Sequence, residues 1–532
     1  MHLYPTRSTF HVAVLGVGLV TLGTAARLAP VAAFGGAMLL AVALGRAIAR
    51  TSITRLRSAG FEMIWLEPRR TVRVSRAGSV TLRAELRNRS DEAVRVTGLR
   101  AVASSMLETS VETEVLDLPP GARAVIDVTA RGKRVGRWGV HGLALEVSGT
   151  PFGAEGLYEA PLLFANPLGI EVLPPQLDAF IRNARGGRSR HASEMGRVAF
   201  HRGQADELRE LRDHMPGDPL KRVAWKASAR RGRLLVREME RHEREVVWLV
   251  VDASVELWAG APGSAPLDRV IDEAAAVAAR LLRRGDRVGL VVTASRVRAW
   301  IKPDLGAAHG SVVAGALASA ANVVDADRSE LDEAQVARRV VEHARPLDPR
   351  GLADLSRHDI DSLAARAEEL RQNAPFAARL PFAATPREQA LRHYLASFGI
   401  EVPPRVDGER DAAESTLARA LSSLGIERPR ANAVYVWAPA PTKPTLMAKA
   451  VASLRKRGCL LEWTLPPFEA GLGADPERRR SVLEDVADEA VVLRAGAARE
   501  RGERMLRRLG VRPVARRVRP GLPLGAREGW RA

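Results

Sequence analysis

Apolar residues form two long runs at the start of the chain, at residues 10–26 and 28–45. Each run has about the minimum length that a helix needs to cross ~30 Å of hydrocarbon. Only Arg27 separates the two apolar cores. A second run that follows at once favours a transmembrane helical hairpin over a cleaved signal peptide. We therefore predict this hairpin over residues 1–50.

The charges that flank these runs predict an orientation. Arg7 precedes the first run, and Arg46, Arg50, Arg55 and Arg57 follow the second. Because basic residues concentrate on the cytoplasmic side of a membrane, both ends of the hairpin are expected there. The chain is thus expected in the inner membrane with its bulk in the cytoplasm. Its basic juxtamembrane stretch would suit the anionic lipid of that bilayer.

Short segments of alternating apolar and polar residues follow, over residues 51–178. Residues 122–130 and 141–149 alternate with period two, and turn signals such as Pro119-Pro120-Gly121 separate the segments. Several short strands at this spacing predict an immunoglobulin-like β-sandwich. Residues 179–245 are rich in Arg, and within them 184–203 is typical of a linker or an exposed loop.

From residue 246 to residue 532 the pattern alternates between strands and helices. A continuous apolar run from Val246 ends in Asp252, as expected for a strand that is covered on both faces. The further predicted elements are helices at 268–283, 445–457, 476–487 and 496–509, and strands at 288–293, 296–301, 433–438 and 459–465. This alternation predicts a doubly wound, mostly parallel α/β sheet. A helical insertion is expected at about 322–430, with one helix starting at Thr385-Pro386.

Composition restricts the function classes. The chain is 46% hydrophobic, which is ample for folded cores, and its formal net charge is +19. A basic surface favours anionic partners, although genome composition explains a spread-out Arg excess equally well. The only cysteine is Cys459, so no intrachain disulfide can form. No Gly-x-Ser-x-Gly, phosphate-loop or His-Glu-x-x-His motif is present, and we predict that the protein is not an enzyme.

A short polar motif begins at the end of the first α/β strand. Asp252, Ser254 and Glu256 alternate there, and ligands of open parallel sheets gather beyond the carboxyl ends of the strands. The motif resembles the metal-ion-dependent adhesion site of von Willebrand factor A domains, with Glu256 in place of a serine. Ser311 would be a weak substitute for the threonine of that site, and residues 436–439 lack its later acid. Two interpretations stay open: a degenerate Mg²⁺ site, or polar groups that cap the following loop and helix.

The Arg-rich segment at 208–243 carries a second set of marks. They are Arg209, Gly217, Asp218, Trp225, Ser228, Arg230, Arg237 and Glu238. Together with the hairpin, the sandwich and the A-like domain, they resemble the bacterial domain-of-unknown-function-58 family. Pro219 and Ala224 depart from that pattern, because each stands where the family has an acid.

The basic residues of this segment allow two interpretations. They could form an anion-binding face with Trp225 as a stacking platform. We favour the alternative, in which the arginines pair with nearby acids such as Asp213 and Glu240, and Trp225 packs in the core.

The family resemblance implies a membrane-anchored scaffold or adaptor that works with a MoxR-type AAA ATPase in the assembly or remodelling of other proteins. One alternative is a basic, membrane-tethered protein that binds anionic lipid or nucleic acid, of which nucleic acid is the less expected partner. A second alternative is a metal-dependent hydrolase.

Overall fold

The computed structural model divides the chain into two compact units. One contains residues 1–173 and 322–405, and the other contains residues 174–321 and 406–532. The residues that the structure describes are 3–76, 78–112, 116–149, 158–175, 177–179, 197–199, 207–215, 220, 223–243, 245–258, 260–348, 359–405, 409–467, 482–514 and 518–520.

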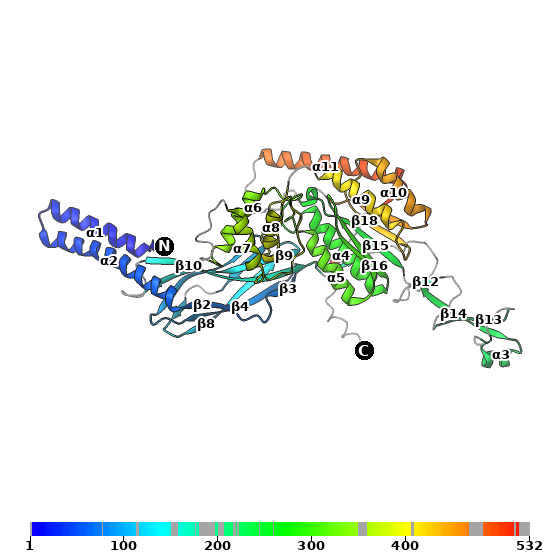
Figure 1. The fold of residues 1–532 in the computed structure, drawn as a ribbon, viewed down its shortest axis with the longest axis horizontal. Coiled ribbons are helices and arrows are strands. Elements are labelled where there is room, and N and C mark those ends of the chain that lie inside the picture. The colour runs from blue at the N-terminus through cyan, green and yellow to red at the C-terminus, as the bar shows by residue number, and fades with distance from the viewer. Residues whose placement is uncertain are drawn as a thin grey trace. The chain divides into compact units, whose positions relative to one another are not determined.

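Two apolar helices open the first unit: α1 (Arg7–Ala25) and α2 (Ala29–Ala59) (Figure 1). Both are long and apolar enough to cross a membrane. A side chain at Gly23 would clash with the backbone of Ala32, so the two helices pack closely through small residues. The two predicted apolar helices are therefore present, although α2 continues past residue 50, and Ile53 and Leu56 join the core of the adjoining β-rich region.

Two sheets pack over this core. The larger sheet contains β1 (Tyr4–Pro5), β10 (Tyr158–Leu173), β9 (Gly136–Gly149), β5 (Val94–Ala103) and β7 (Leu116–Leu118) in that order, with β3 (Thr71–Ser75) parallel to β10. The smaller sheet contains β2 (Phe61–Trp65), β4 (Ser79–Asn88), β8 (Arg123–Gly132) and β6 (Leu107–Val111). Alternate residues such as Leu82, Ala84 and Leu86 are fully buried, because one face of each strand covers the core. The predicted period-two strands are thus present.

Three helices complete this unit: α6 (Glu333–Ala344), α7 (Ile360–Arg371) and α8 (Pro386–Phe398). The predicted start of α8 is confirmed, since the Thr385 hydroxyl accepts a hydrogen bond from the Glu388 amide at 3.2 Å. These helices come from the first part of the segment predicted as an insertion at 322–430. Its last helix, α9 (Arg410–Leu424), lies in the second unit.

The second unit is built around a six-stranded sheet. Its order is β17 (Val297–Asp304), β16 (Arg287–Thr293), β15 (Val246–Asp252), β18 (Ala433–Trp437), β19 (Leu460–Thr464) and β20 (Arg512–Pro513). All neighbours pair in parallel except β17, which forms the predicted antiparallel partner of β16. The predicted mostly parallel sheet is therefore correct.

Helices cover both faces of this sheet (Figure 1). Residues Val246, Trp248 and Val250 pack with α9, α10 (Pro444–Lys456) and α11 (Val482–Arg508). The other face contacts α4 (Pro266–Arg284) and α5 (Gly306–Ala320). Because α11 is continuous through Gly496, the prediction of two separate helices at 476–487 and 496–509 was wrong over the described residues.

Shorter elements complete the second unit. A three-stranded sheet contains β12 (Arg197–Ala199), β14 (Leu235–Glu243) and β13 (Glu207–Asp213), and the short helix α3 (Trp225–Arg231) precedes β14. Strand β11 (Leu177–Ala179) pairs with β21 (Val518–Pro520).

Candidate functional site

Asp252 lies at the carboxyl end of the central strand of the second unit. All seven residues of β15 are buried, and parallel neighbours β16 and β18 flank it on its two sides. The chain leaves β15 for α4 and β16 on one side, and reaches β18 on the other side only much later. In doubly wound sheets, this change of direction is where ligands bind.

Asp252 and Ser254 form the floor of this site. The Asp252 carboxylate accepts a hydrogen bond from the Ser254 amide at 3.0 Å, and both residues are buried. Burial raises the pKa of Asp252 to about 6, against the lowering effects of that amide and of Arg410. Among the described residues, the buried Ser254 hydroxyl has no hydrogen-bond partner. The arrangement thus presents a buried carboxyl group and a buried hydroxyl at the strand end.

Glu256 lies in the short 3₁₀ helix Val255–Trp258 that follows. Its side chain is 36% exposed, and one of its oxygens lies 3.6 Å from a guanidinium nitrogen of Arg410. Burial raises the pKa of Glu256, whereas Arg410 acts in the opposite direction. The three residues predicted from the sequence, Asp252, Ser254 and Glu256, are therefore brought to one strand end, where Glu256 pairs with an arginine.

Glu409 holds two of the strand-end loops. One oxygen of its buried carboxylate accepts from the Val255 amide after β15, and the other accepts from the Ser295 amide after β16, both at 2.8 Å. The Thr416 hydroxyl donates to the Ser295 carbonyl at 2.8 Å. These residues, at and within the start of α9, fix the ends of β15 and β16 relative to each other.

The same helix holds the loop after β18. Arg410 donates to the Ala440 carbonyl at 2.5 Å, and Glu414 accepts from the Thr442 and Lys443 amides at 2.9 and 2.6 Å. On the exposed side, Lys443 forms an ion pair with Asp411 at 3.0 Å. Side chains of α9 therefore connect all three loops that end β15, β16 and β18.

A divalent cation does not fit these residues as they are arranged. Both oxygens of Glu409 accept backbone hydrogen bonds, and Glu256 faces Arg410, whose positive charge opposes a second cation. Within the described ranges, no group of three or more His, Cys, Asp or Glu side chains could hold a metal ion. Hard cations such as Mg²⁺ need several available oxygens.

The other positions considered for a metal site lie elsewhere. Ser311 is exposed on α5, and its hydroxyl donates to the Ala307 carbonyl of its own helix at 3.3 Å. Trp437 at the end of β18 is buried, and its indole nitrogen donates to Glu273 at 3.1 Å. Neither residue contributes an oxygen ligand at the end of β15.

In the Arg-rich segment, the position of Trp225 differs from the interpretation that we favoured. Trp225 begins α3 and is 62% exposed, so the prediction that it packs in the core was wrong. The buried residue of this helix is Ser228, whose hydroxyl donates to the Ala224 carbonyl at 3.0 Å and accepts from the Leu235 amide at 2.9 Å. The inward position of this short helix is thus a small polar residue that ties α3 to β14.

The arginines of this segment are only partly described. Asp213 pairs with Arg233 at 3.0 Å, both on the surface, and Arg230 is exposed. Arg209, Arg237 and Glu238 lie on the strands β13 and β14, and their side chains lie outside the described residues, as do Gly217 and Asp218.

Sequence reasoning missed Glu409 and Arg410. They stand in the charged stretch Asp407-Gly408-Glu409-Arg410-Asp411, which looks like a solvated surface. A usable signal was the position of these charges at the start of the last helix before β18. In a doubly wound sheet, such a helix begins at the edge where the strands end.

Comparison with known proteins identifies one family. Residues 210–347 match the model described as "Protein of unknown function DUF58", which confirms the resemblance predicted from the sequence. No curated protein matches the chain significantly.

Several solved structures match parts of the chain, but none of those described below is similar enough to inform on its fold. The secreted serine protease VesC from Vibrio cholerae matches 23% of this chain and 24% of its own at 11% identity and a TM-score of 0.17. A PapD-like domain of human CEP192 matches 21% of this chain and 85% of its own, at 11% identity and a TM-score of 0.16. The alpha-2-macroglobulin from Escherichia coli covers 85% of this chain and 62% of its own, at 12% identity and a TM-score of 0.16. The chain thus spans about a quarter of the protease, and all three TM-scores are too low to show a shared fold.

Proposed function

We propose that this chain, which belongs to the DUF58 family through residues 210–347, is a membrane-anchored scaffold that binds a partner protein at the strand-end face of its second unit. That face is defined by the loops that follow β15, β16 and β18. Helices α1 and α2 would anchor it, with the bulk of the chain in the cytoplasm. A von Willebrand A-like fold for the second unit and an immunoglobulin-like fold for the sandwich are parts of this proposal.

One observation supports the proposal most. Helix α9 connects the three loops through Glu409, Arg410 and Glu414, so the face is preorganised before any partner arrives. A preorganised surface lowers the cost of ordering loops on binding. The carboxylates are used to hold backbone amides, which suits a binding face better than the acid–base chemistry of a hydrolase.

The partner that family resemblance suggests is a MoxR-type AAA ATPase, and the scaffold would serve protein assembly or remodelling. Exposed groups at the rim of the face could take part in contact. Asp411 is 73% exposed and Lys443 is 45% exposed at this rim. Charged rim residues steer association and set specificity more than they set affinity.

Site-specific photo-crosslinking in detergent extracts tests this assignment. A photoreactive residue at position 411 reports on the face, and one at Ile426, which is 72% exposed just beyond the opposite end of α9, is the matched control. We expect a crosslink to the ATPase from position 411 but not from position 426. Equal crosslinking from both positions, or none from position 411 with or without ATP, would contradict the assignment.

A second function has support from the Arg-rich segment. Met215, Leu220 and Trp225 are 57%, 64% and 62% exposed, and the basic residues Lys226, Arg230 and Arg231 belong to the same short helix as Trp225. A tryptophan among cationic side chains suits the interface of an anionic bilayer. This segment would then contact anionic lipid in addition to the anchoring by the hairpin.

Flotation with vesicles separates this function from the first. A fragment is unsuitable, so the full chain in nanodiscs should be offered vesicles of phosphatidylserine or of phosphatidylcholine. We expect capture only by the anionic vesicles, lost at high salt and weakened by Trp225→Ala. Capture that neither salt nor this substitution reduces would exclude the segment as a lipid-binding surface.

A further inference from the structure

We propose that the guanidinium of Arg410 takes the place that a divalent cation would occupy at the strand end of β15, so that the face works without metal. This inference deepens the proposed function, because it assigns the chemistry that holds the binding face together. It concerns the residues that the von Willebrand A resemblance suggests as Mg²⁺ ligands.

The contacts of Arg410 match what a bound cation does. Its guanidinium lies 3.6 Å from Glu256 in the segment after β15, and 2.5 Å from the Ala440 carbonyl in the loop after β18. It thus draws oxygens of two different loops toward one positive charge. A metal ion would achieve the same result with shorter bonds to the same kinds of oxygen.

The preceding residue completes the arrangement with a negative charge. Glu409 accepts from backbone amides of the loops after β15 and β16, and this carboxylate is buried. The N-cap residue and the first residue of α9 therefore provide both an anion for backbone N–H groups and a cation for oxygens. Neither interaction needs an ion from solution.

The acids around Arg410 explain why its charge matters. Asp252, Glu256 and Glu409 converge at this strand end, and the field of Arg410 opposes the rise in the pKa of both Asp252 and Glu256. Without Arg410, the carboxylates of Asp252 and Glu256 would remain beside the Ser254 hydroxyl with no positive charge between them, while Glu409 stays bound to backbone amides. Carboxylates and a hydroxyl are the oxygen donors that Mg²⁺ and Mn²⁺ prefer.

Removal of Arg410 should therefore create a metal site. The probe is Mn²⁺, whose free form is measured by electron paramagnetic resonance during titration of the full chain in detergent. Wild-type protein should leave Mn²⁺ free, whereas Arg410→Ala should bind one equivalent, with affinity raised roughly tenfold or more by the loss of the like charge. Arg410→Lys, which keeps the positive charge, should remain free of metal.

Two further variants assign any binding to this site. Asp252→Asn in the Arg410→Ala background should abolish it, and Arg419→Ala, which removes an exposed arginine of the same helix, should not create it. Should Arg410→Ala fail to fold by circular dichroism, Arg410→Gln provides the same comparison. The proposal is overturned if wild-type protein binds Mn²⁺ in an Asp252-dependent manner, or if the folded variants without Arg410 bind none. Since no partner is needed, failure here is distinguishable from failure of the scaffold assignment.

Discussion

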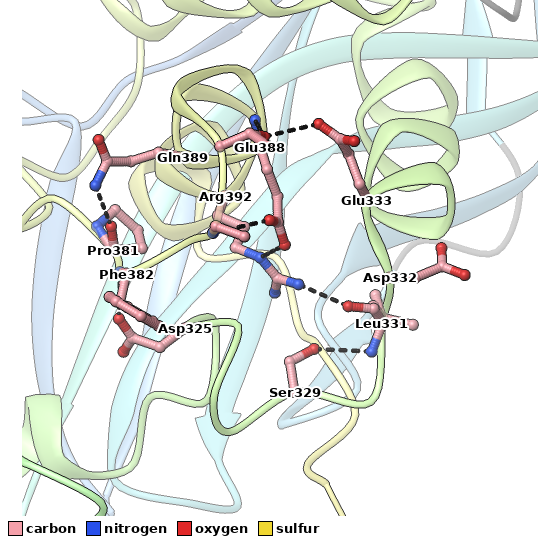
Figure 2. Close-up of polar contacts among 12 residues, drawn as sticks. Asp325, Ser329, Leu331, Asp332, Glu333, Pro381, Phe382, Glu388, Gln389 and Arg392 are labelled. Carbon is pink, nitrogen blue, oxygen red and sulfur yellow. Dashed lines mark hydrogen bonds and ion pairs between the residues drawn. The ribbon is translucent and has the colours of Figure 1, made fainter.

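Two arginines, one in each unit, show how different environments give one residue type different roles. Arg392 in α8 is almost fully buried, and its guanidinium donates to Glu388 at 2.8 Å and to the carbonyls of Val324 and Leu331 at 2.8 and 2.6 Å. Figure 2 shows Arg392 enclosed between Glu388 and Leu331. Arg410 has a side chain that is 22% exposed, a carbonyl partner and a more distant carboxylate.

The difference concerns how completely the charge is satisfied. Arg392 has partners in well-formed hydrogen bonds on each of its three guanidinium nitrogens, so it is a fixed structural element. Arg410 stands at the open end of a sheet, among more acids than it can neutralise. Removing one partner of a fully paired buried charge destabilises a fold because the other charge is left uncompensated, whereas a partly open charge at a strand end can also recognise a ligand.

The largest effect on the unfolding free energy is expected from removing Arg392. Arg392→Met leaves Glu388 buried without its partner, and breaking such a pair costs about 3–5 kcal/mol of unfolding free energy. Chemical denaturation of the full chain measures this loss, and hydrogen exchange in α8 of the native protein locates it. The matched control is Arg387→Met in the same helix, whose ion pair with Glu333 is more exposed and should cost less than about 1 kcal/mol. Equal losses of unfolding free energy from Arg392→Met and Arg387→Met would show that the burial of Arg392 does not set its contribution.

A smaller loss is expected at the strand end. Glu409→Gln keeps one acceptor oxygen but loses the second acceptor and the negative charge that hold the Val255 and Ser295 amides. This loss should lower the unfolding free energy by roughly 2 kcal/mol. Amide hydrogen exchange in residues 253–258 and 294–296 should accelerate. Asp411→Asn, at an exposed neighbouring acid, should leave exchange in both segments unchanged. Unchanged exchange in Glu409→Gln would contradict the role given to this carboxylate.

Acid should destabilise the unit that contains Arg392 through two buried histidines. His343 in α6 lies 2.9 Å from both His141 in β9 and the Tyr394 hydroxyl in α8. Burial lowers the pKa of His141 to about 4, and burial together with His141 lowers the pKa of His343 to about 3. Both imidazoles are thus neutral in the folded state, whereas an unfolded histidine titrates near pH 6.5.

Proton linkage determines the direction in which the stability of this unit changes with pH. As the pH falls below 6.5, both histidines bind protons in the unfolded state but not in the folded state, so the stability of this unit should decline. The decline due to His141 should end near pH 4, and the decline due to His343 near pH 3. Unfolding midpoints between pH 7 and pH 5 measure the effect, and His343→Gln should flatten this dependence. A midpoint that rises on acidification would contradict the neutral assignment.

The smallest effect on stability is expected at Trp225, away from either arginine. Because its side chain is 62% exposed, Trp225→Ala should change the unfolding free energy by no more than about 0.5 kcal/mol. Ser228→Ala, which removes the buried hydroxyl of the same helix, should cost more, at about 1–2 kcal/mol. If Trp225→Ala proves the more destabilising of the two, the exposed position of the tryptophan is wrong.

Periodicity predicted the elements better than it predicted their surroundings. The apolar runs at Val246–Val251 and 433–437 were sufficient to predict strands of a parallel sheet, because full burial requires a continuous apolar run. The position of Asp252 at a strand end followed directly. Trp225 was misplaced because a large aromatic residue suggests a core, although the short helix that carries it buries only one narrow side.

Contacts between distant segments could not be predicted from the sequence. Glu409 meets Val255 and Ser295 across 154 and 114 residues, and only the order of the strands brings them together. In the same way, the helices of residues 333–398 look like an interruption of the α/β pattern, yet they belong to the unit that contains the two antiparallel-rich sheets. Hydrophobic patterns specify which face of an element is buried but not which element covers it.

We infer that α9 and its N-cap residue hold the strand-end loops without a metal ion. The most direct measurement compares amide exchange in residues 253–258 and 294–296 of the wild-type chain in EDTA and in Mg²⁺. We predict equal protection under both conditions, because Glu409 and Arg410 provide the charges that order these loops. Protection that rises with Mg²⁺ in wild type, but not in Asp252→Asn, would show instead that a bound metal ion orders these loops.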